Sequence, residues 1–371
     1  MLEKIAKFDS VLRPKLINLP FLFAARIYSP GRKFFVKKIG EQELENPIRI
    51  SDEHKQTFWG IEFGVPLFNA AGMFKSGEGY SAMARQGAGA FLAGTTTSEP
   101  RIGNKKSCIT HPFLPLPYSK SAVNWMGLPN KGHYYTAKKL ALCKKIHGCP
   151  IGASIAPVPE TINISAATGL VEGLNIYERA NVDFVEINES CPNVVHTKGE
   201  SNDCGLDSAL IERLEFVSEY YIKKRIRKFP IIVKFSVDTN PALVPDLIKL
   251  LINLGYDGAN FGNTSLNYEN AERFLHKREI RNFRKFTAKF GGGVSGTPLK
   301  KLSLELASAA RKTVDEINPD REFHIIRTGG IETAEDIKES KNNGIALNQW
   351  FTGYFEAFSE NGNQLYKEIF K

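Results

Sequence analysis

After residue 60 the chain alternates short apolar runs with amphipathic segments, and this alternation restricts its fold more than any other feature. Eight runs have the length and composition of buried strands: 67–72, 90–95, 151–156, 184–189, 231–236, 258–263, 324–328 and 346–350. Amphipathic helical segments lie between most of them. The clearest, 241–255, carries one stripe of leucine and isoleucine that ends at a glycine. Eight strand–helix units predict an α/β chain folded as a (β/α)8 TIM barrel.

A doubly wound parallel sheet is the alternative fold, and it requires a glycine-rich dinucleotide turn after the first strand. Residues 70–75 (AAGMFK) do not form such a turn. Two long segments interrupt the barrel pattern, 97–123 after the second strand and 265–297 after the sixth. Segments of this length in a compact domain are usually lids or inserts. We expect residues 1–56 to form an N-terminal helical extension and residues 57–371 to form the barrel.

Composition excludes several classes of protein. Of the 371 residues 42% are hydrophobic, which suffices for one large core. We expect no membrane-spanning helix, because no apolar run approaches the roughly 20 residues required, and no secretory signal. Five cysteines, scattered and odd in number, indicate a reducing compartment and no disulfide framework. Histidine and cysteine do not cluster at metal-ligand spacing, so we expect no metal site.

The net charge of +9 is concentrated at the N-terminus. Residues 1–40 hold nine Lys and Arg against two acidic residues, a charge of +7 that leaves +2 for the rest. A nucleic-acid-binding surface is therefore not favoured. The segment is also rich in Leu, Ile and Phe, as in helices that dock on a membrane surface or a partner. The alternative is a cap packed on the barrel with solvated charges. We expect a cytoplasmic chain, with peripheral contact to the inner face of the cell membrane in the docking case.

Polar residues cluster at the carboxyl ends of the predicted strands, where a barrel of this kind has its active site. The segment 188–193 (NESCPN) places two Asn and a Cys at the end of the fourth strand. Cys191 could act as nucleophile, redox centre or proton-transfer group; alternatively it is a buried structural cysteine. Lys234 lies within an apolar strand and needs a partner or an anionic ligand, unless it extends outward between helices.

Glycine-rich segments occur late in the chain: 292–296 precedes a helix, 328–331 follows the seventh strand and 351–353 follows the eighth. Glycines allow backbone N–H groups to approach phosphate oxygens, and a helix N-terminus adds a favourable dipole. A phosphate site, a lysine in the fifth strand and a cysteine on the fourth together suggest FMN with a polar, flat substrate stacked on it.

These motifs resemble those of the dihydroorotate dehydrogenase family, over roughly residues 57–365. The matching segments are 69–72 (NAAG), 75–78 (KSGE), 124–130 (NWMGLPN), 188–193, Lys234, 257–258, 263–264, 292–296, 329–330 and 351–352. The resemblance implies oxidation of dihydroorotate to orotate in de novo pyrimidine synthesis, with FMN as cofactor and a quinone or a soluble molecule as final electron acceptor.

The resemblance also implies roles for individual residues. Cys191 corresponds to the base that takes the C5 proton of dihydroorotate, while the C6 hydride passes to FMN. Lys234 corresponds to the cation near the flavin N1–C2 carbonyl. The substrate-binding positions are Lys75, Asn124, Trp125, Met126, Gly127, Leu128, Asn188, Asn193, Asn263 and Thr264. The cofactor-binding positions are Ala71, Gly72, Lys75, Thr95, Ser154, Asn188, Lys234, Gly262, Gly296, Gly329, Gly330, Phe351 and Thr352.

The chain combines features of two branches of this family. Segments 71–75 and 94–97 are similar to the membrane-bound, quinone-reducing branch, as is the N-terminal extension. Segment 124–130 and Cys191 are similar to the soluble branch, which has Cys as the base where the quinone branch has Ser. Glu189, Ser154 and 195–196 depart from the family patterns. Two other functions stay open: an FMN barrel acting on another pyrimidine ring, and a non-catalytic binding protein. No pattern indicates an oligomeric state.

Overall fold

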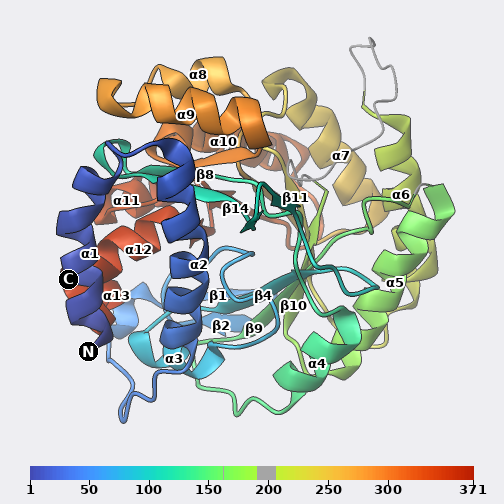
Figure 1. Cartoon of the computed structure of the whole chain (residues 1–371). Helices are drawn as coiled ribbons and strands as arrows, with labels where there is room; N and C mark the ends of the chain where they lie inside the picture. The colour runs from blue at the N-terminus through green and yellow to red at the C-terminus, as the bar shows by residue number, and fades with distance from the viewer. Residues whose placement is uncertain (162, 190–205) are drawn as a thin grey trace.

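The computed structural model describes residues 1–161, 163–189 and 206–371. Its centre is one sheet of eight parallel strands that curves into a nearly closed barrel, as predicted (Figure 1). The strands follow one another around the barrel in this order: β3 (Leu67–Asn69), β15 (Leu347–Trp350), β14 (His324–Thr328), β12 (Gly258–Phe261), β11 (Ile231–Phe235), β10 (Phe184–Asn188), β9 (Ile151–Ile155) and β4 (Phe91–Thr96). Each of the eight apolar runs therefore overlaps one barrel strand.

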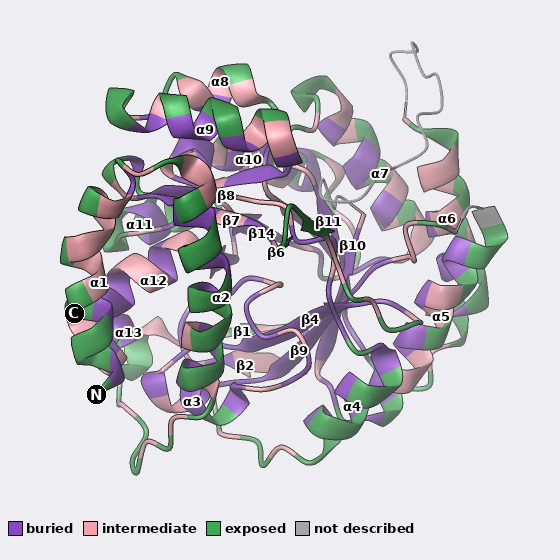
Figure 2. Ribbon diagram, viewed as in Figure 1, coloured by how far each residue is buried: buried purple, intermediate pink, exposed green. Residues whose placement is uncertain are grey.

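Helices cover the outside of the barrel and bury the side chains that alternate away from its interior (Figure 2). They are α3 (Tyr80–Gln86), α4 (His133–Ala141), α5 (Asn163–Arg179), α6 (Ser208–Tyr220), α7 (Val244–Leu254), α10 (Lys300–Ile317), α11 (Ala334–Asn342), α12 (Thr352–Asn361) and α13 (Leu365–Ile369). Helix α7 follows a 3-10 turn at Pro241–Leu243. It ends where Gly255 adopts a left-handed conformation, φ +89°, so its leucine stripe and its final glycine behave as the sequence indicates.

The barrel interior is apolar at one end. Inward-facing residues of the strands, among them Phe68, Phe184 and Ile232, form a separate cluster there with Trp59 and Phe63. The last two belong to a hairpin of β1 (Gln56–Phe58) and β2 (Ile61–Phe63) that covers this end. Two residues further along the strands the inward-facing side chains become polar. Because water is excluded at the hairpin end, only the carboxyl ends of the strands remain available for a ligand site.

A side chain joins the two edge strands of the barrel. Asn69, fully buried at the end of β3, donates from Nδ2 to the Leu92 carbonyl of β4 at 2.8 Å. Its Oδ1 accepts from the Leu92 N–H at 3.2 Å. Further along, the Gly72 N–H donates to the Gly94 carbonyl at 2.7 Å. The carboxamide thus satisfies backbone groups that a regular strand ladder would otherwise pair.

The two predicted inserts meet in a single subdomain. The first contributes β5 (Lys105–Lys106), β6 (Ile109–Thr110), β7 (Phe113–Leu116) and β8 (Ser121–Asn124). The second contributes α8 (Tyr268–Glu272), α9 (Lys277–Phe290) and β13 (Gly293–Gly296). Strands β13, β8 and β7 form one antiparallel sheet. Apolar residues from both inserts, including Leu114, Val123 and Phe286, share a second core that extends to Ile17 and Ala24 of the N-terminal segment.

The N-terminal extension consists of α1 (Leu2–Leu16) and α2 (Phe21–Gly40). Arg13 of α1 pairs with Glu356 of α12 at 2.7 Å and with Asp9 at 2.8 Å, which fastens this helix to the barrel. Part of the N-terminal charge is therefore used in packing, whereas the cap interpretation expected solvated charges. The boundary at residue 56 stays a prediction. Within the described residues, no helix combines the length and apolar character needed to cross a membrane.

The carboxamide of Asn69 generates a stability prediction. Asn69→Leu leaves the buried N–H and C=O of Leu92 without these partners, at about 1–3 kcal/mol for each unsatisfied group. We expect the free energy of unfolding, measured by denaturant titration, to fall by about 2–5 kcal/mol. The control Asn342→Leu alters an exposed asparagine at the end of α11 and should change it by less than about 1 kcal/mol. Equal stability of the two variants would show that the seam between β3 and β4 does not depend on this side chain.

Candidate active site

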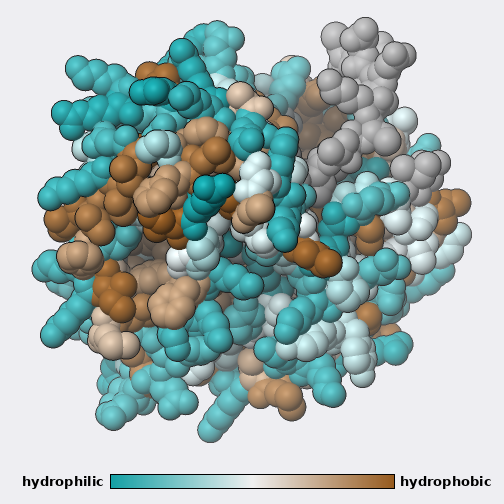
Figure 3. Space-filling view, in the orientation of Figure 1, coloured by the Kyte–Doolittle hydropathy of each residue, from teal (hydrophilic) through white to brown (hydrophobic). Residues whose placement is uncertain are grey.

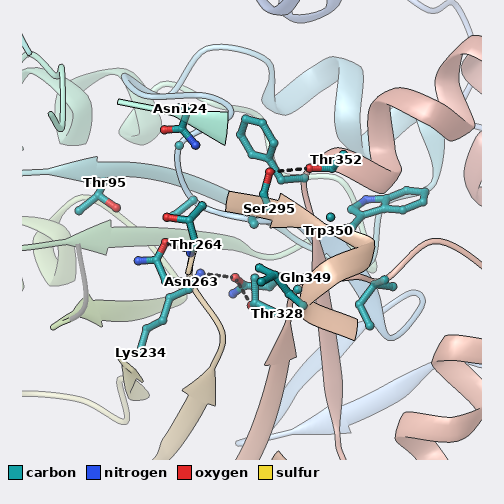
Figure 4. Close-up of a pocket in the computed structure, with 18 of the residues that line it drawn as sticks. Thr95, Asn124, Lys234, Asn263, Thr264, Ser295, Thr328, Gln349, Trp350 and Thr352 are labelled. Carbon is teal, nitrogen blue, oxygen red and sulfur yellow. Dashed lines mark hydrogen bonds between the residues drawn. The ribbon is translucent and has the colours of Figure 1, made fainter. Parts of the chain in front are cut away.

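A pocket opens at the carboxyl ends of the barrel strands, between the barrel and the insert sheet. About 970 Å³ of space, including solvent at the open mouth, lies between its lining residues. The structure places these sequence-predicted residues in its wall: Ala71, Gly72, Lys75, Thr95, Asn124, Met126, Leu128, Asn188, Lys234, Asn263, Thr264, Gly296, Gly329, Gly330, Phe351 and Thr352. Figure 4 shows how side chains from opposite sides of the barrel converge on this space.

The pocket floor is a buried network around Lys234. The ammonium group donates to Gln349 Oε1 at 2.9 Å and lies 3.4 Å from Glu186 Oε1. Glu186 Oε2 accepts from the amides of Gln349 and Asn260, both at 2.7 Å. Lys234 is 3% exposed and Glu186 is 1% exposed. Lys234 therefore points into the barrel, where a counter-charge and a neutral acceptor both hold it.

The chemistry of these partners fixes the orientation of the Gln349 amide. A carboxylate only accepts and an ammonium only donates, so the amide must turn its nitrogen to Glu186 and its oxygen to Lys234. The Thr328 hydroxyl lies 2.9 Å from Asn260 Oδ1 and 3.0 Å from Gln349 Oε1. It can donate its one proton to either oxygen, and it completes the ring of contacts beneath the pocket.

Burial lowers the pKa of Lys234, and the charge of Glu186 opposes that shift. A lysine isolated at this depth would tend to lose its proton. The carboxylate therefore maintains the positive charge at the floor, where an anionic group bound above it would be stabilised electrostatically.

Hydroxyl and carboxamide groups line one wall of the pocket. Asn188, at the end of β10, donates to Thr95 Oγ1 at 3.3 Å and accepts from Asn263 Nδ2 at 3.2 Å. The hydroxyl of Thr95 lies 2.9 Å from that of Ser154. Asn124 reaches the same space from the insert strand β8. Groups that both donate and accept, placed on three sides, match a planar ligand with amide and carbonyl edges.

The opposite end of the pocket suits a phosphate group. The Ser295 and Thr352 hydroxyls meet there at 2.9 Å, and Gly329, Gly330 and Gly353 line the wall. Helix α12 begins at Thr352 and has no side-chain cap at its N-terminus. Its first N–H groups, which have no acceptor within the helix, can bind an anion, and the helix dipole favours one.

Four of the predicted site residues that the structure describes do not line the pocket. Ser154 is fully buried behind Thr95. The Trp125 ring stacks on Phe290 in the insert core, with centroids 6.3 Å apart. A Cβ on Gly127 would stand 2.3 Å from the Asn104 side chain, and one on Gly262 would stand 1.5 Å from the Thr328 carbonyl oxygen. These four residues support the wall without lining it. Cys191 and Asn193 lie outside the described residues.

Sequence reasoning missed Glu186, Asn260 and Gln349 on the floor and Trp350 in the wall. Ser295 and Thr328 lie in the glycine-rich segments predicted to bind phosphate but were not singled out as site residues. A signal was present for the floor residues. Side chains in a strand alternate between the two faces, so Glu186, two residues before Asn188, had to share its inward direction. The polar residues of the strand ends were considered, but those one layer deeper inside the barrel were not.

Comparison with known proteins identifies the family. The model of the family described as "Dihydroorotate dehydrogenase" matches residues 54–370. The chain belongs to the dihydroorotate dehydrogenase family. It is therefore an oxidoreductase of a family that uses FMN. The family assignment from sequence is confirmed.

Similar proteins from two bacteria carry the name dihydroorotate dehydrogenase (quinone). The one from Trichodesmium erythraeum is 27% identical over 330 residues, covering 86% of this chain and 82% of the relative. The one from Christiangramia forsetii is 28% identical over 352 residues, covering 94% of each. A DHODH crystal structure from Eimeria tenella, in complex with ferulenol, superimposes with a TM-score of 0.74 at 20% identity, covering 92% of this chain and 89% of that one. This structural likeness supports the barrel fold.

The residues present fit FMN at this position. The cofactor has a flat ring with amide and carbonyl edges and a phosphate at the end of a flexible chain. The pocket has the corresponding two ends, with Lys234, Asn188 and Thr95 at one and the uncapped α12 terminus with Gly330 at the other.

The floor network generates a second prediction. Glu186→Leu leaves the Lys234 ammonium buried without its counter-charge, which typically costs about 3–5 kcal/mol of unfolding free energy. The matched double variant Glu186→Leu/Lys234→Leu replaces both charges by apolar groups and should recover most of that loss. Chemical denaturation of Glu186→Leu, Lys234→Leu and the double variant measures the coupling free energy between the two charges. Additive effects would show that the two charges do not interact.

Proposed function

We propose that this chain oxidises dihydroorotate to orotate in pyrimidine synthesis and delivers the electrons to a quinone. The observation that carries the proposal is the convergence on one pocket of a buried lysine, a wall of carboxamides and a phosphate-binding terminus. The family match and the names of the similar proteins support the same reaction.

We infer that Lys234, Asn188, Thr95 and the backbone at Gly329, Gly330 and Thr352 hold FMN. When bound, FMN supplies the acceptor for the hydride that leaves C6 of dihydroorotate. Lys234 would stabilise negative charge at the floor of the pocket. Its link to Glu186 would keep it protonated and in place while that charge develops.

The other polar groups would bind and orient the substrate. Asn124, Asn188, Asn263, Thr264 and Lys75 come from four segments and carry the donors and acceptors that a carboxylate and a cyclic imide require. Cys191 follows Asn188 by three residues. By family resemblance it would take the C5 proton as a general base. Fixing the ring from several sides would hold the reacting carbon in one orientation.

Replacement of the proposed base tests the chemistry. Cys191→Ala should slow flavin reduction by dihydroorotate by roughly a hundredfold or more, because general-base catalysis typically contributes that much. Anaerobic stopped-flow absorbance measures this half-reaction. Cys108→Ala, at an exposed cysteine of the first insert, should leave the rate unchanged. An unchanged rate in the Cys191 variant would remove this residue from the role of base.

A binding assay tests the substrate class independently of the base. Orotate should raise the melting temperature of the flavin-loaded protein, since it occupies the carboxamide wall, and uracil should not. Stabilisation by uracil alone would instead favour an FMN barrel that acts on another pyrimidine ring.

A second cleft supports quinone as the electron acceptor. It lies between α1, α2, β7 and α12, encloses about 1030 Å³ and is lined mainly by apolar side chains such as Ile27, Phe35 and Phe355. Phe351 and Thr352 line both this cleft and the pocket described above. A lipid-soluble acceptor bound here would be separated from the flavin site by two residues. The resemblance of Cys191 to the soluble branch therefore does not decide the acceptor.

Arg32 is the polar group best placed for a quinone carbonyl. It lines the cleft from α2 and is 9% exposed. Its Nε has no hydrogen-bond partner among the described residues. Burial lowers the pKa of Arg32 to about 10, so the guanidinium stays charged at neutral pH. Such a donor in an apolar cleft can orient a carbonyl-bearing ring.

The outer face of α2 supports contact with a membrane. Phe23, Ile27 and Phe34 form one exposed apolar stripe, at 51%, 40% and 54% exposure. Ile27 and Phe34 also line the acceptor cleft, so the stripe borders its mouth. Figure 3 shows hydrophobic side chains gathered over this part of the surface. We infer that α1 and α2 dock peripherally, so that quinone passes directly from lipid into the cleft.

The cleft generates a separate prediction. Arg32→Leu should lower kcat/KM for a quinone about tenfold or more, because a hydrogen bond to a charged donor is worth about 1.5–3 kcal/mol. Flavin reduction by dihydroorotate should not change. Arg26→Leu, at an exposed arginine of the same helix, is the matched control. Deleting residues 1–40 should abolish quinone reduction with flavin reduction intact. Equal quinone activity in Arg32→Leu and wild type would exclude the guanidinium from acceptor binding.

A further inference from the structure

Helix α9 of the second insert presents an unusually basic outer face. Its fourteen residues contain six Lys and Arg and one acid, Glu279. Glu279 is buried and accepts from the Tyr118 N–H at 2.8 Å, so its charge points into the protein. Lys277, Arg281 and Lys285 are exposed and spaced four residues apart. They form one stripe along the helix, which we call the α9 basic stripe.

Two of the other three cations of the helix have nearby partners, and the third, Lys289, is partly buried near the end of the helix. Arg284 forms an ion pair with Glu272, and Arg278 lies over the Tyr118 ring, 5.5 Å from its centroid. The α9 basic stripe differs: across the described residues, none of its three side chains has an acidic group within 4.0 Å. Three neighbouring cations that lack such compensation create a local positive potential able to attract an anionic surface.

Direct contacts fasten α9 to the N-terminal helices. Asn282 donates from Nδ2 to the Ile17 and Leu19 carbonyls, at 2.5 and 3.0 Å, in the turn between α1 and α2. Phe290 packs edge-on against Phe21 at 6.4 Å. In Figure 1 the helix lies directly above α1 and α2, and Figure 3 shows hydrophilic side chains bordering the apolar area there. The α9 basic stripe and the apolar stripe of α2 thus lie on two helices that pack together.

We propose that the α9 basic stripe binds the anionic headgroups of a membrane while the α2 stripe inserts among the lipid chains. This inference rests on the proposed docking of α1 and α2, and it assigns the electrostatic part of that docking to an insert in the barrel. An anionic lipid surface is favoured over a nucleic acid because α9 packs on the turn that leads into α2, the helix that carries the exposed phenylalanines. Lipid binding uses both features, whereas a phosphate backbone would use only the charges.

The test compares two variants of the full chain, loaded with FMN. Arg281→Glu/Lys285→Glu reverses two charges of the stripe. Lys138→Glu/Lys144→Glu makes the same change in net charge at exposed positions on and just after α4, on the other side of the molecule in Figure 1. Co-sedimentation measures binding to vesicles of phosphatidylcholine alone and of phosphatidylcholine with phosphatidylglycerol. Reduction of a soluble dye by dihydroorotate is measured in parallel.

The α9 variant should bind the anionic vesicles at least about thirtyfold more weakly than wild type, since each basic residue near such a surface contributes roughly fivefold. Its binding to neutral vesicles, and that of the α4 control to both, should match wild type. High salt should reduce wild-type binding toward the level of the variant. Wild-type binding of anionic vesicles by the α9 variant would overturn the proposal. Equal losses of vesicle binding in the α9 variant and the α4 control would also overturn it. Binding to heparin, a soluble polyanion, is measured as well, and an α9 variant that loses heparin binding but keeps vesicle binding would overturn it too.

The dye assay separates this proposal from the enzymatic one. Both variants leave the active site untouched and should reduce the dye at the wild-type rate. Absence of dihydroorotate oxidation in the wild type would refute the proposed reaction, whereas the vesicle result would still report on the α9 basic stripe.

Discussion

The buried pair of Lys234 and Glu186 is the constraint on which the rest of the site depends. A barrel interior of this size can be filled entirely by apolar side chains, and the hairpin end is filled in that way. Placing a lysine one layer higher requires a compensating carboxylate. That carboxylate in turn requires the amides of Asn260 and Gln349 to satisfy its second oxygen. One cation thus determines the residue types on several strands and leaves a charged, pre-oriented floor under the pocket.

Around that floor, segments that are distant in sequence each supply one part. The strand ends supply the carboxamides, and α12 supplies the anion site. The inserts supply the roof through β8 and β13. The N-terminal helices add an apolar cleft against the same α12. The division is physically reasonable, because polar groups come from the rigid barrel while the lipid-compatible surface comes from elements added outside it. A barrel scaffold can therefore acquire a new electron acceptor without changes to the strands that bind its substrate.

Much of the fold could be predicted from sequence, because apolar runs of strand length and glycine-ended helices are local signals. The apolar flanks of Lys234 indicated a buried or ligand-bound lysine but left its direction open, and the late glycines predicted an anion-binding end. The roles of Glu186 and Gln349 were missed, although strand alternation could have indicated them. The link that Asn69 makes between β3 and β4 could not be predicted from sequence. It depends on the folded position of the Leu92 backbone, which lies on the opposite edge strand.

The joining of the two inserts in one sheet also could not be read from local pattern. Their strands are separated by about half of the chain and pair only in the folded protein. The same limit applies to the acceptor cleft, whose wall combines α1, α2, β7 and α12. The sequence did indicate that the N-terminal segment was both basic and apolar. It could not show that its apolar face would line a cleft sharing Phe351 with the pocket.

That shared wall has a consequence for inhibition. The polar pocket and the apolar cleft have only Phe351 and Thr352 in common among the described lining residues. An inhibitor bound beside Arg32 in the apolar cleft would leave the carboxamides of the polar pocket accessible to substrate. A higher concentration of dihydroorotate therefore could not displace that inhibitor. Inhibitors of the two compartments should therefore follow different kinetic patterns. Bulky replacements at residue 351 should alter sensitivity to both classes at once.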